Sequence, residues 1–187
     1  SAASGLPVSV GYATSNGTAS AGADYTATSG TLSFAAGVTS QTVTVTIAED
    51  TIFEGNESLN VTLSAPTNAT IATATGVGTI IDNDAAPTLA VSSPTIGEAG
   101  GFAVFTLTLS NPSATATTVS LALAHLSATG SGTDYGSATA TNLQVSTDGG
   151  TTWTSATSAT FAVGATSLLV RTPVVNMSMR ALIGIVQ

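Results

Sequence analysis

Short alternating segments constrain the fold of this chain more than any other feature. In Thr42 to Ile47, TVTVTI, apolar β-branched residues alternate with threonine. Similar alternation occurs over Leu6 to Thr14, Gly30 to Phe34 and Ser58 to Leu63. A period of two residues is typical of a strand with one buried face. Because turn residues interrupt such segments every eight to twelve residues or so, the sequence predicts an all-β sandwich.

The order of the segments predicts how two strands pair. An acidic loop separates Thr42 to Ile47 from Ser58 to Leu63, so we expect these two strands to form an antiparallel pair. After Pro66, Ala69 to Ala74 and Gly76 to Ile81 are interpreted as one further strand that bends at a glycine.

Composition limits both the class of protein and its partners. The chain has 187 residues, of which 43% are hydrophobic, enough to build the cores of two domains. The net charge is −8 and lysine is absent, which excludes nucleic acid as a partner because phosphate binding needs clustered basic residues. No apolar run reaches the roughly eighteen residues of a membrane-spanning helix, so we expect no membrane insertion. The N-terminus has no signal-peptide pattern, so a secretion signal would lie outside this sequence.

Most of the negative charge is concentrated in two short segments. Six of the ten acidic residues lie in the loop AEDTIFEGNE, Ala48 to Glu57, or in the triplet Asp82-Asn83-Asp84. Carboxylates crowded in this way are typical of a calcium site, since calcium takes about six to eight oxygen ligands and the chain has no cysteine. The alternative is that these side chains belong to solvated turns.

Several spaced motifs resemble one known family. PVSVGYAT, GTASAGADY, GTLSFAAGVTSQTVTVTIAEDTIFEGNESLNVTLS and GTIIDND occur in the order found in the Calx-beta repeat, over nearly all of residues 1–84. The resemblance implies an immunoglobulin-like β-sandwich that binds calcium at one end. It also implies which residues hold the ions. The expected metal ligands are Asp24, Glu49, Asp50, Ile52 through its carbonyl, Glu54, Glu57, Asp82 and Asp84.

Three departures from the family pattern weaken this expected site. Thr51 and Asn83 stand where the family's tight-binding members carry aspartates. The family's opening strand, which carries a glutamate that reaches the ions, would precede Ser1. We therefore expect fewer or weaker ions than in a complete domain of this kind.

The pattern starts again in the second half of the chain. GEAGGFAVFTLTLS supplies Glu98 and a strand over Phe102 to Leu109, and SGTDY places Asp134 where AGADY places Asp24. ATFAVGATSLLVRTPVV repeats LSFAAGVTSQTVTVTIA, whereas Leu143 to Thr154 is an insertion that predicts a hairpin with an Asp-Gly-Gly turn. The chain is therefore expected to be a tandem array of sandwiches.

The expected domains follow from this repeat. They are a Calx-beta sandwich over 1–84, a linker over 85–94 and an incomplete second sandwich over 95–187. The tail 177–187 follows Asn176 and has the sequence MSMRALIGIVQ. It resembles nothing else in the repeat. We expect the second unit to lack the acidic loop and triplet, which would leave Glu98 and Asp134 too few to hold calcium well.

Two other functions are open. Trp153 and the tyrosines could stack on sugar rings, which would make the chain a carbohydrate-binding accessory module of a secreted hydrolase. An enzyme is the third possibility, but the sequence has no nucleophile motif and His125, its only histidine, is expected to be structural. We favour a calcium-binding repeat that stiffens an extracellular adhesin or cell-surface protein, next to further repeats of the same protein.

The incomplete sandwiches predict open sheet edges. Unpaired strand edges bind other strands, so we expect complementation within the chain or by exchange between copies, which would give a homo-oligomer. The candidate donor strands are Ala181 to Val186 and Phe102 to Leu109. Exchange between copies is favoured.

Overall fold

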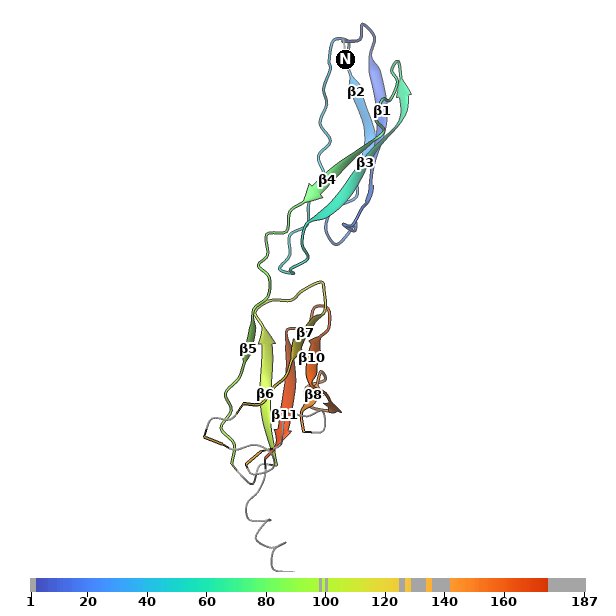
Figure 1. Ribbon diagram of the computed structural model, residues 1–187. Coiled ribbons are helices and arrows are strands. Elements are labelled where there is room, and N and C mark those ends of the chain that lie inside the picture. The colour runs from blue at the N-terminus through green and yellow to red at the C-terminus, as the bar shows by residue number, and fades with distance from the viewer. Residues whose placement is uncertain are drawn as a thin grey trace, which may run out of the picture. The chain divides into compact units, whose positions relative to one another are not determined.

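The computed structural model describes residues 3–97, 99, 101–124, 127–128, 134–135 and 142–174, and these form two compact units, 1–84 and 85–187. Among these described residues, every regular element longer than one residue is a β-strand, as the alternating patterns predict (Figure 1). Among the described residues, no helix is long and apolar enough to cross a membrane. The all-β prediction is confirmed.

The first unit contains one four-stranded antiparallel sheet in the order β2-β1-β3-β4. Its strands are β1 (Val8–Asn16), β2 (Ser29–Phe34), β3 (Glu57–Thr67) and β4 (Thr75–Ile80). The expected strands at 6–14, 30–34 and 58–63 are therefore present with shifted ends. The expected strand over 69–81 is shorter, because pairing with β3 runs only from Thr75 to Ile80.

Two expectations about Thr42–Ile47 are wrong. Only Ile47 takes part in a bridge, to Tyr25, and the residues from 42 to 46 belong to no strand. The segment is also not paired with β3, which instead lies between β1 and β4. The acidic loop therefore connects this segment to β3, an inner strand of the sheet, and is not a hairpin turn between paired strands.

The core of the first unit lies between the sheet and this crossing segment. Tyr25 is 1% exposed and Ala19 and Leu59 are also buried, and Val45, Val61 and Ile80 pack against them. The Tyr25 hydroxyl donates a hydrogen bond of 2.7 Å to Asn16 Oδ1, which satisfies its polar end. This packing places Ile47, and the acidic loop after it, beside the end of β4.

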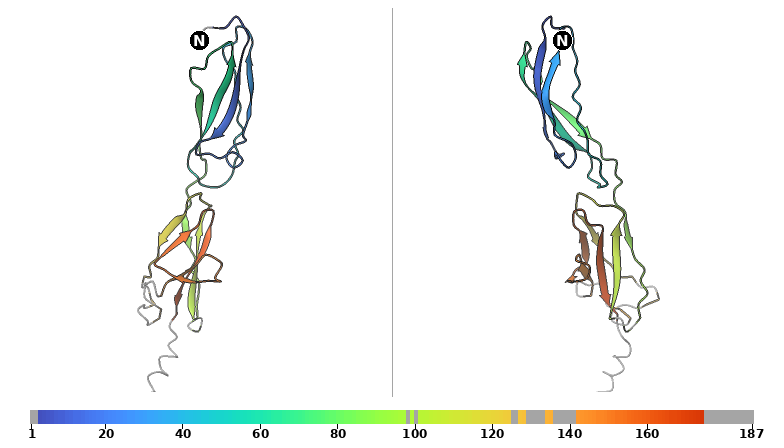
Figure 2. Two further views of the ribbon diagram at one scale, coloured as in Figure 1. Left: turned by 90° about the vertical axis from the view of Figure 1, so that its right-hand side faces the viewer. Right: turned by 180° about the vertical axis from the view of Figure 1, so that it is seen from behind.

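The second unit has two sheets. A five-stranded sheet has the order β5-β6-β11-β8-β9, and a two-stranded sheet pairs β10 with β7. The strands are β5 (Leu89–Val91), β6 (Phe102–Leu109), β7 (Thr117–Ser120), β8 (Gln144–Ser146), β9 (Thr154–Ser155), β10 (Ser158–Phe161) and β11 (Ser167–Pro173). Leu107, Phe161 and Leu168 form part of the buried cluster between the sheets, which makes this unit a sandwich (Figure 2).

Several expectations concern the second unit. The predicted insertion hairpin is present as β8 and β9, which pair antiparallel beside β11. Part of the segment 85–94, expected as a linker, is strand β5 and pairs with β6. The predicted strand Phe102–Leu109 is β6 and pairs with β5 and β11 of its own unit. Glu98, His125, the tail 177–187 and the donor strand Ala181 to Val186 lie outside the described residues.

Candidate metal centre

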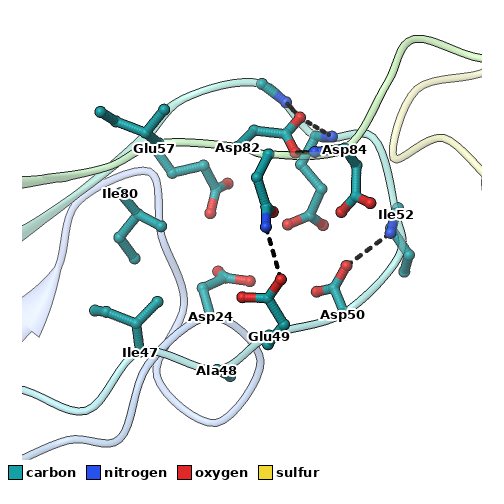
Figure 3. A pocket seen from close by; sticks show the side chains of 14 residues that line it. Asp24, Ile47, Ala48, Glu49, Asp50, Ile52, Glu57, Ile80, Asp82 and Asp84 are labelled. Atoms are coloured by element: carbon teal, nitrogen blue, oxygen red, sulfur yellow. Dashed lines mark hydrogen bonds between the residues drawn. The ribbon is translucent and has the colours of Figure 1, made fainter.

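Asp24, the acidic loop and the triplet at 82–84, which the sequence singles out, meet at one end of the first unit. They line a single pocket of about 170 Å³. Figure 3 shows their side chains around this pocket. All eight predicted ligands are among the lining residues: Asp24, Glu49, Asp50, Ile52, Glu54, Glu57, Asp82 and Asp84.

Asp24, the acidic loop and the triplet each reach the pocket from a different part of the first unit. Asp24 precedes the buried Tyr25, and its backbone carbonyl accepts a hydrogen bond of 2.9 Å from Ala48 N, which holds the start of the acidic loop beside it. Glu57 is the first residue of β3, and Asp82 follows the end of β4. Because β3 and β4 pair Glu57 with Ile80, the two strand ends lie side by side.

Three carboxylates converge closely. Asp24, Glu54 and Glu57 each offer one oxygen, and these three oxygens lie within 4.8 Å of one another. Asp24 and Glu57 are half-buried, whereas Glu54 is exposed. Such a spacing allows one hard cation to contact all three side chains, since calcium–oxygen distances are about 2.3 to 2.6 Å.

Hydrogen bonds from backbone amides of the acidic loop to the Asp82 carboxylate stabilise the conformation of the loop. Asp82 Oδ2 accepts hydrogen bonds from Glu54 N at 3.0 Å and Gly55 N at 2.7 Å. Gly55 has a φ of 78°, a left-handed conformation that favours glycine, at the turn where both amides donate to Asp82. Asp82 therefore ties the tip of the loop to the end of β4.

Two further contacts close the loop. Asp50 Oδ1 accepts a hydrogen bond of 2.7 Å from Ile52 N, an Asx turn inside the loop. Asn83 Nδ2 donates 2.7 Å to Glu49 Oε1, so the amide at position 83 links the triplet to the start of the loop. The sequence showed Asn83 only as a departure from the family pattern, and its partner could not be identified from spacing.

The electrostatics of the pocket separate its carboxylates into two kinds. Partial loss of hydration, followed by repulsion from Asp24, raises the pKa of Glu54 and the pKa of Glu57 above their ordinary values. Partial loss of hydration, followed by repulsion from Asp82, also raises the pKa of Asp84. Backbone hydrogen bonds, the largest from Asp84 N, lower the pKa of Asp82.

This division indicates different roles for the two kinds of carboxylate. Asp82 is already satisfied by protein donors and positions the loop. Glu54 and Glu57 are held near other negative charges, and a bound cation would relieve that repulsion. Carboxylate, carbonyl and amide oxygens are also the ligand type that calcium prefers, so the residues present fit this ion.

One residue that sequence reasoning missed is Asn56, whose side-chain oxygen accepts a hydrogen bond of 3.2 Å from Asp82 N. The isoleucines Ile47, Ile80 and Ile81 also line the pocket. Only the alternating pattern of the strands that end there could have indicated them.

The second unit has a different kind of acidic residue at its insertion. Asp148 accepts hydrogen bonds from Ser146 Oγ at 2.7 Å and from Thr152 N at 2.9 and 3.0 Å, and a further one from Thr152 Oγ1. Hydrogen bonds from Thr152, first from its side chain, hold the pKa of Asp148 well below its usual range. Its carboxylate therefore closes the turn of the hairpin.

Trp153 is also committed to this hairpin. Its Nε1 donates a hydrogen bond of 2.9 Å to Gly150 O, and the Arg171 guanidinium lies 4.1 Å from its ring centroid. The guanidinium also lies 4.0 Å from the Phe102 ring centroid, and its Nε donates to Gln144 Oε1 at 2.7 Å. These contacts link β6, β11 and β8 through their side chains and give Trp153 a packing role.

Comparisons with known proteins identify the repeat. The profile of the Calx-beta domain matches residues 4–84 and again residues 82–153. Among curated proteins no match was found. Among solved structures, the chain is similar to the apo-form of the Calx CBD1 domain, with 33% identity over 42% of this chain and 72% of that one and a TM-score of 0.40.

Two longer structures are also similar. The calcium binding domain CBD12 of CALX1.1 is 21% identical over 89% of this chain, with a TM-score of 0.42. CBD12 from CALX1.2 is 23% identical over 91% of this chain, also with a TM-score of 0.42. The chain spans 62% and 64% of the lengths of these two structures.

Proposed function

The chain belongs to the Calx-beta domain family, and from this premise we propose that its first unit binds calcium through the pocket between Asp24, the acidic loop and the triplet at 82–84. The observation that carries the proposal is the convergence of Asp24, Glu54 and Glu57, whose oxygens lie within 4.8 Å of one another. Chemistry supports calcium in particular, because the pocket is lined by oxygen ligands and the chain has no cysteine.

The proposed ligands form a central group and a further group. Asp24, Glu54 and Glu57 are the central ligands, and Glu49, Asp50, Asp84 and the Ile52 carbonyl are the further ones. Asp82 contributes by holding the loop in place as well as by its charge, because its Oδ2 accepts hydrogen bonds from two backbone amides of the loop. The polar side chain of Asn83 joins Glu49 without adding charge, which supports a weaker site than a fully acidic one.

Calcium would act by cross-linking three segments that are far apart in sequence. An ion that binds only the folded state adds stability of RT ln(1 + [L]/Kd), about 1.4 kcal/mol at a tenfold excess over Kd. Modules outside the cell tend to have calcium dissociation constants of about 0.1 to 1 mM. We therefore propose that the chain is a structural repeat, stiffened by calcium, of an adhesin or other cell-surface protein outside the cell.

This role is non-catalytic, and the carbohydrate-binding alternative is less well supported. A sugar needs a free aromatic face, whereas Trp153 is half-buried, has Arg171 against its ring and uses its N–H within the hairpin. No other specific feature of the described residues favours sugar binding over calcium binding.

The test is thermal unfolding of the full chain in calcium, in magnesium and in chelator. We expect calcium to raise the melting temperature of the first unit and to slow hydrogen exchange over 48–57 and 82–84. Magnesium should have a smaller effect, because it demands a stricter octahedral geometry and gives up its waters reluctantly. Identical melting and exchange in calcium and in chelator would contradict the proposal.

A further inference from the structure

The start of the acidic loop is joined to the triplet by one pair of side chains. Asn83 Nδ2 donates a hydrogen bond of 2.7 Å to Glu49 Oε1, and the two residues are 34 positions apart in sequence (Figure 3). The hydrogen bonds between Asp82 and the loop involve residues 54–56 instead. Among the described residues, no other hydrogen bond joins residues 48–52 to the triplet.

The chemistry of this pair fixes which group donates. An ionised carboxylate only accepts hydrogen bonds, whereas a side-chain amide supplies two N–H donors, so Asn83 must present its nitrogen to Glu49. A carboxylate at position 83 could not donate and would place a second negative charge beside the first. The bond uses one oxygen of Glu49, and the second oxygen of a carboxylate can still face an ion.

The surroundings of the pair are negatively charged. Partial loss of hydration, and then repulsion from Asp82 and from the carboxylates at the start of the loop, raises the pKa of Asp84. The start of the loop and the triplet therefore repel each other through their charges. The hydrogen bond from Asn83 opposes this repulsion within the protein, as a bound cation would oppose it from outside.

We propose that the Asn83 amide takes the place of a cation beside Glu49 in the ion-free protein, so that the start of the acidic loop stays beside the triplet whether or not calcium is bound. The occupied state is the calcium-bound pocket of the proposed function, on which this role rests. Asn83 acts through Glu49 and is therefore a positioning residue, which orients a carboxylate at the edge of the pocket.

Two backbone amides report on the start of the loop in a hydrogen-exchange experiment on the full chain. Ala48 N donates to Asp24 O, and Ile52 N donates to Asp50 Oδ1. In chelator, Asn83→Asp and Asn83→Leu both remove the side-chain donor, so both amides should exchange about threefold faster or more than in the wild type. Asn83→Asp should be the faster of the two variants, because it also adds a charge.

A double variant separates the hydrogen bond from a role in filling space. Asn83→Asp with Glu49→Gln exchanges donor and acceptor while both side-chain lengths stay the same. The amide at position 49 can then donate to the carboxylate at position 83. In chelator this double variant should exchange more slowly than Asn83→Leu and at close to the wild-type rate.

The matched control is Asn56→Asp, which adds the same charge to the acidic loop. Asn56 Oδ1 accepts a hydrogen bond from Asp82 N, and an aspartate at this position keeps an acceptor there. This control should leave exchange at Ala48 and Ile52 near the wild-type rate in chelator.

Calcium tests the comparison with an ion. An ion can bridge two carboxylates, so calcium should slow exchange at Ala48 and Ile52 more in Asn83→Asp than in the wild type. An equal or smaller effect overturns the proposal. So do wild-type rates in chelator for both single variants at position 83, an equal acceleration by Asn56→Asp, or a double variant no slower than Asn83→Leu. If calcium changes exchange in none of the proteins, the proposed function fails, and the chelator comparison still decides whether Asn83 holds Glu49.

Discussion

The acidic groups of the two units show opposite environments. In the second unit the Asp148 carboxylate accepts hydrogen bonds from Ser146 and Thr152, and its pKa is lowered. In the first unit Glu54 and Glu57 lie beside Asp24, and the pKa of each is raised. A carboxylate that closes a turn is therefore satisfied by protein donors, whereas the crowded carboxylates of the first unit repel one another, and a bound cation would relieve that repulsion.

The largest expected effect separates these two kinds of carboxylate by calcium affinity. Glu54→Ala removes one of the three converging oxygens and should weaken calcium binding by about tenfold or more, a loss of about 1.4 kcal/mol. Asp148→Ala should leave the affinity unchanged, because that carboxylate lies in the hairpin turn of the other unit. Titration of both variants with a calcium-sensitive competitor dye measures the difference. Equal losses would mean that the cluster is assigned wrongly.

The next largest effect is on folding stability, and here Asp148→Ala should have a larger effect than Glu54→Ala. Asp148→Ala leaves the donors of Ser146 and Thr152 without their acceptor, so the hairpin and its contact with β11 should loosen. Fluorescence of Trp153, the only tryptophan, should then report unfolding of the second unit at a lower temperature than in the wild type. In chelator, Glu54→Ala is the control and should leave this transition in place.

The dependence on pH sharpens the same comparison. The pKa of Asp148 is lowered in the folded state, so its contribution to stability is present above its ordinary value of 3.8 and is lost as pH falls below it. Acidification through this range should lower the stability of the second unit, and Asp148→Asn should reduce that dependence. Melting followed by Trp153 fluorescence between neutral and acid pH measures it. A variant with the wild-type slope would contradict the assigned role.

The sequence determined much of this description, but not all of it. Strands β1, β2, β3 and the β8–β9 hairpin could be predicted because alternation and turn residues are local signals. The failure at Thr42–Ile47 has a different cause, because alternation shows that a segment is extended but not that a partner lies beside it. Its counterpart β11 has nearly the same pattern and is a strand because β6 and β8 flank it.

The candidate site could also be predicted only in part from the sequence. The resemblance to a family assigned eight residues, and all eight line one pocket. Spacing alone could not show that Asp82 binds the amides of Glu54 and Gly55, or that Asn83 reaches Glu49. These contacts depend on how β4 ends beside the acidic loop, which is a tertiary property.

The smallest expected effect is a gain in stability when the first unit has no calcium. Glu54→Gln removes a charge that lies near other carboxylates, and the raised pKa of Glu54 means that its ionised form opposes folding. The sign follows from the direction of the shift: a raised folded-state pKa lowers stability as pH rises through the range just above its ordinary value of 4.5. In chelator at neutral pH the variant should unfold at a slightly higher temperature than the wild type, as followed by circular dichroism. A lower melting temperature would show that the Glu54 charge has a favourable partner within the protein.

Calorimetric titration of calcium into the full chain tests the central claim most directly. The wild type should show saturable binding, and Asp148→Asn should bind with the same affinity. The variant with Asp24→Asn and Glu57→Gln together should lose the binding heat, because only one of the three converging carboxylates remains. Absence of binding by the wild type, or undiminished binding by the double variant, would contradict the proposal that these carboxylates form a calcium site.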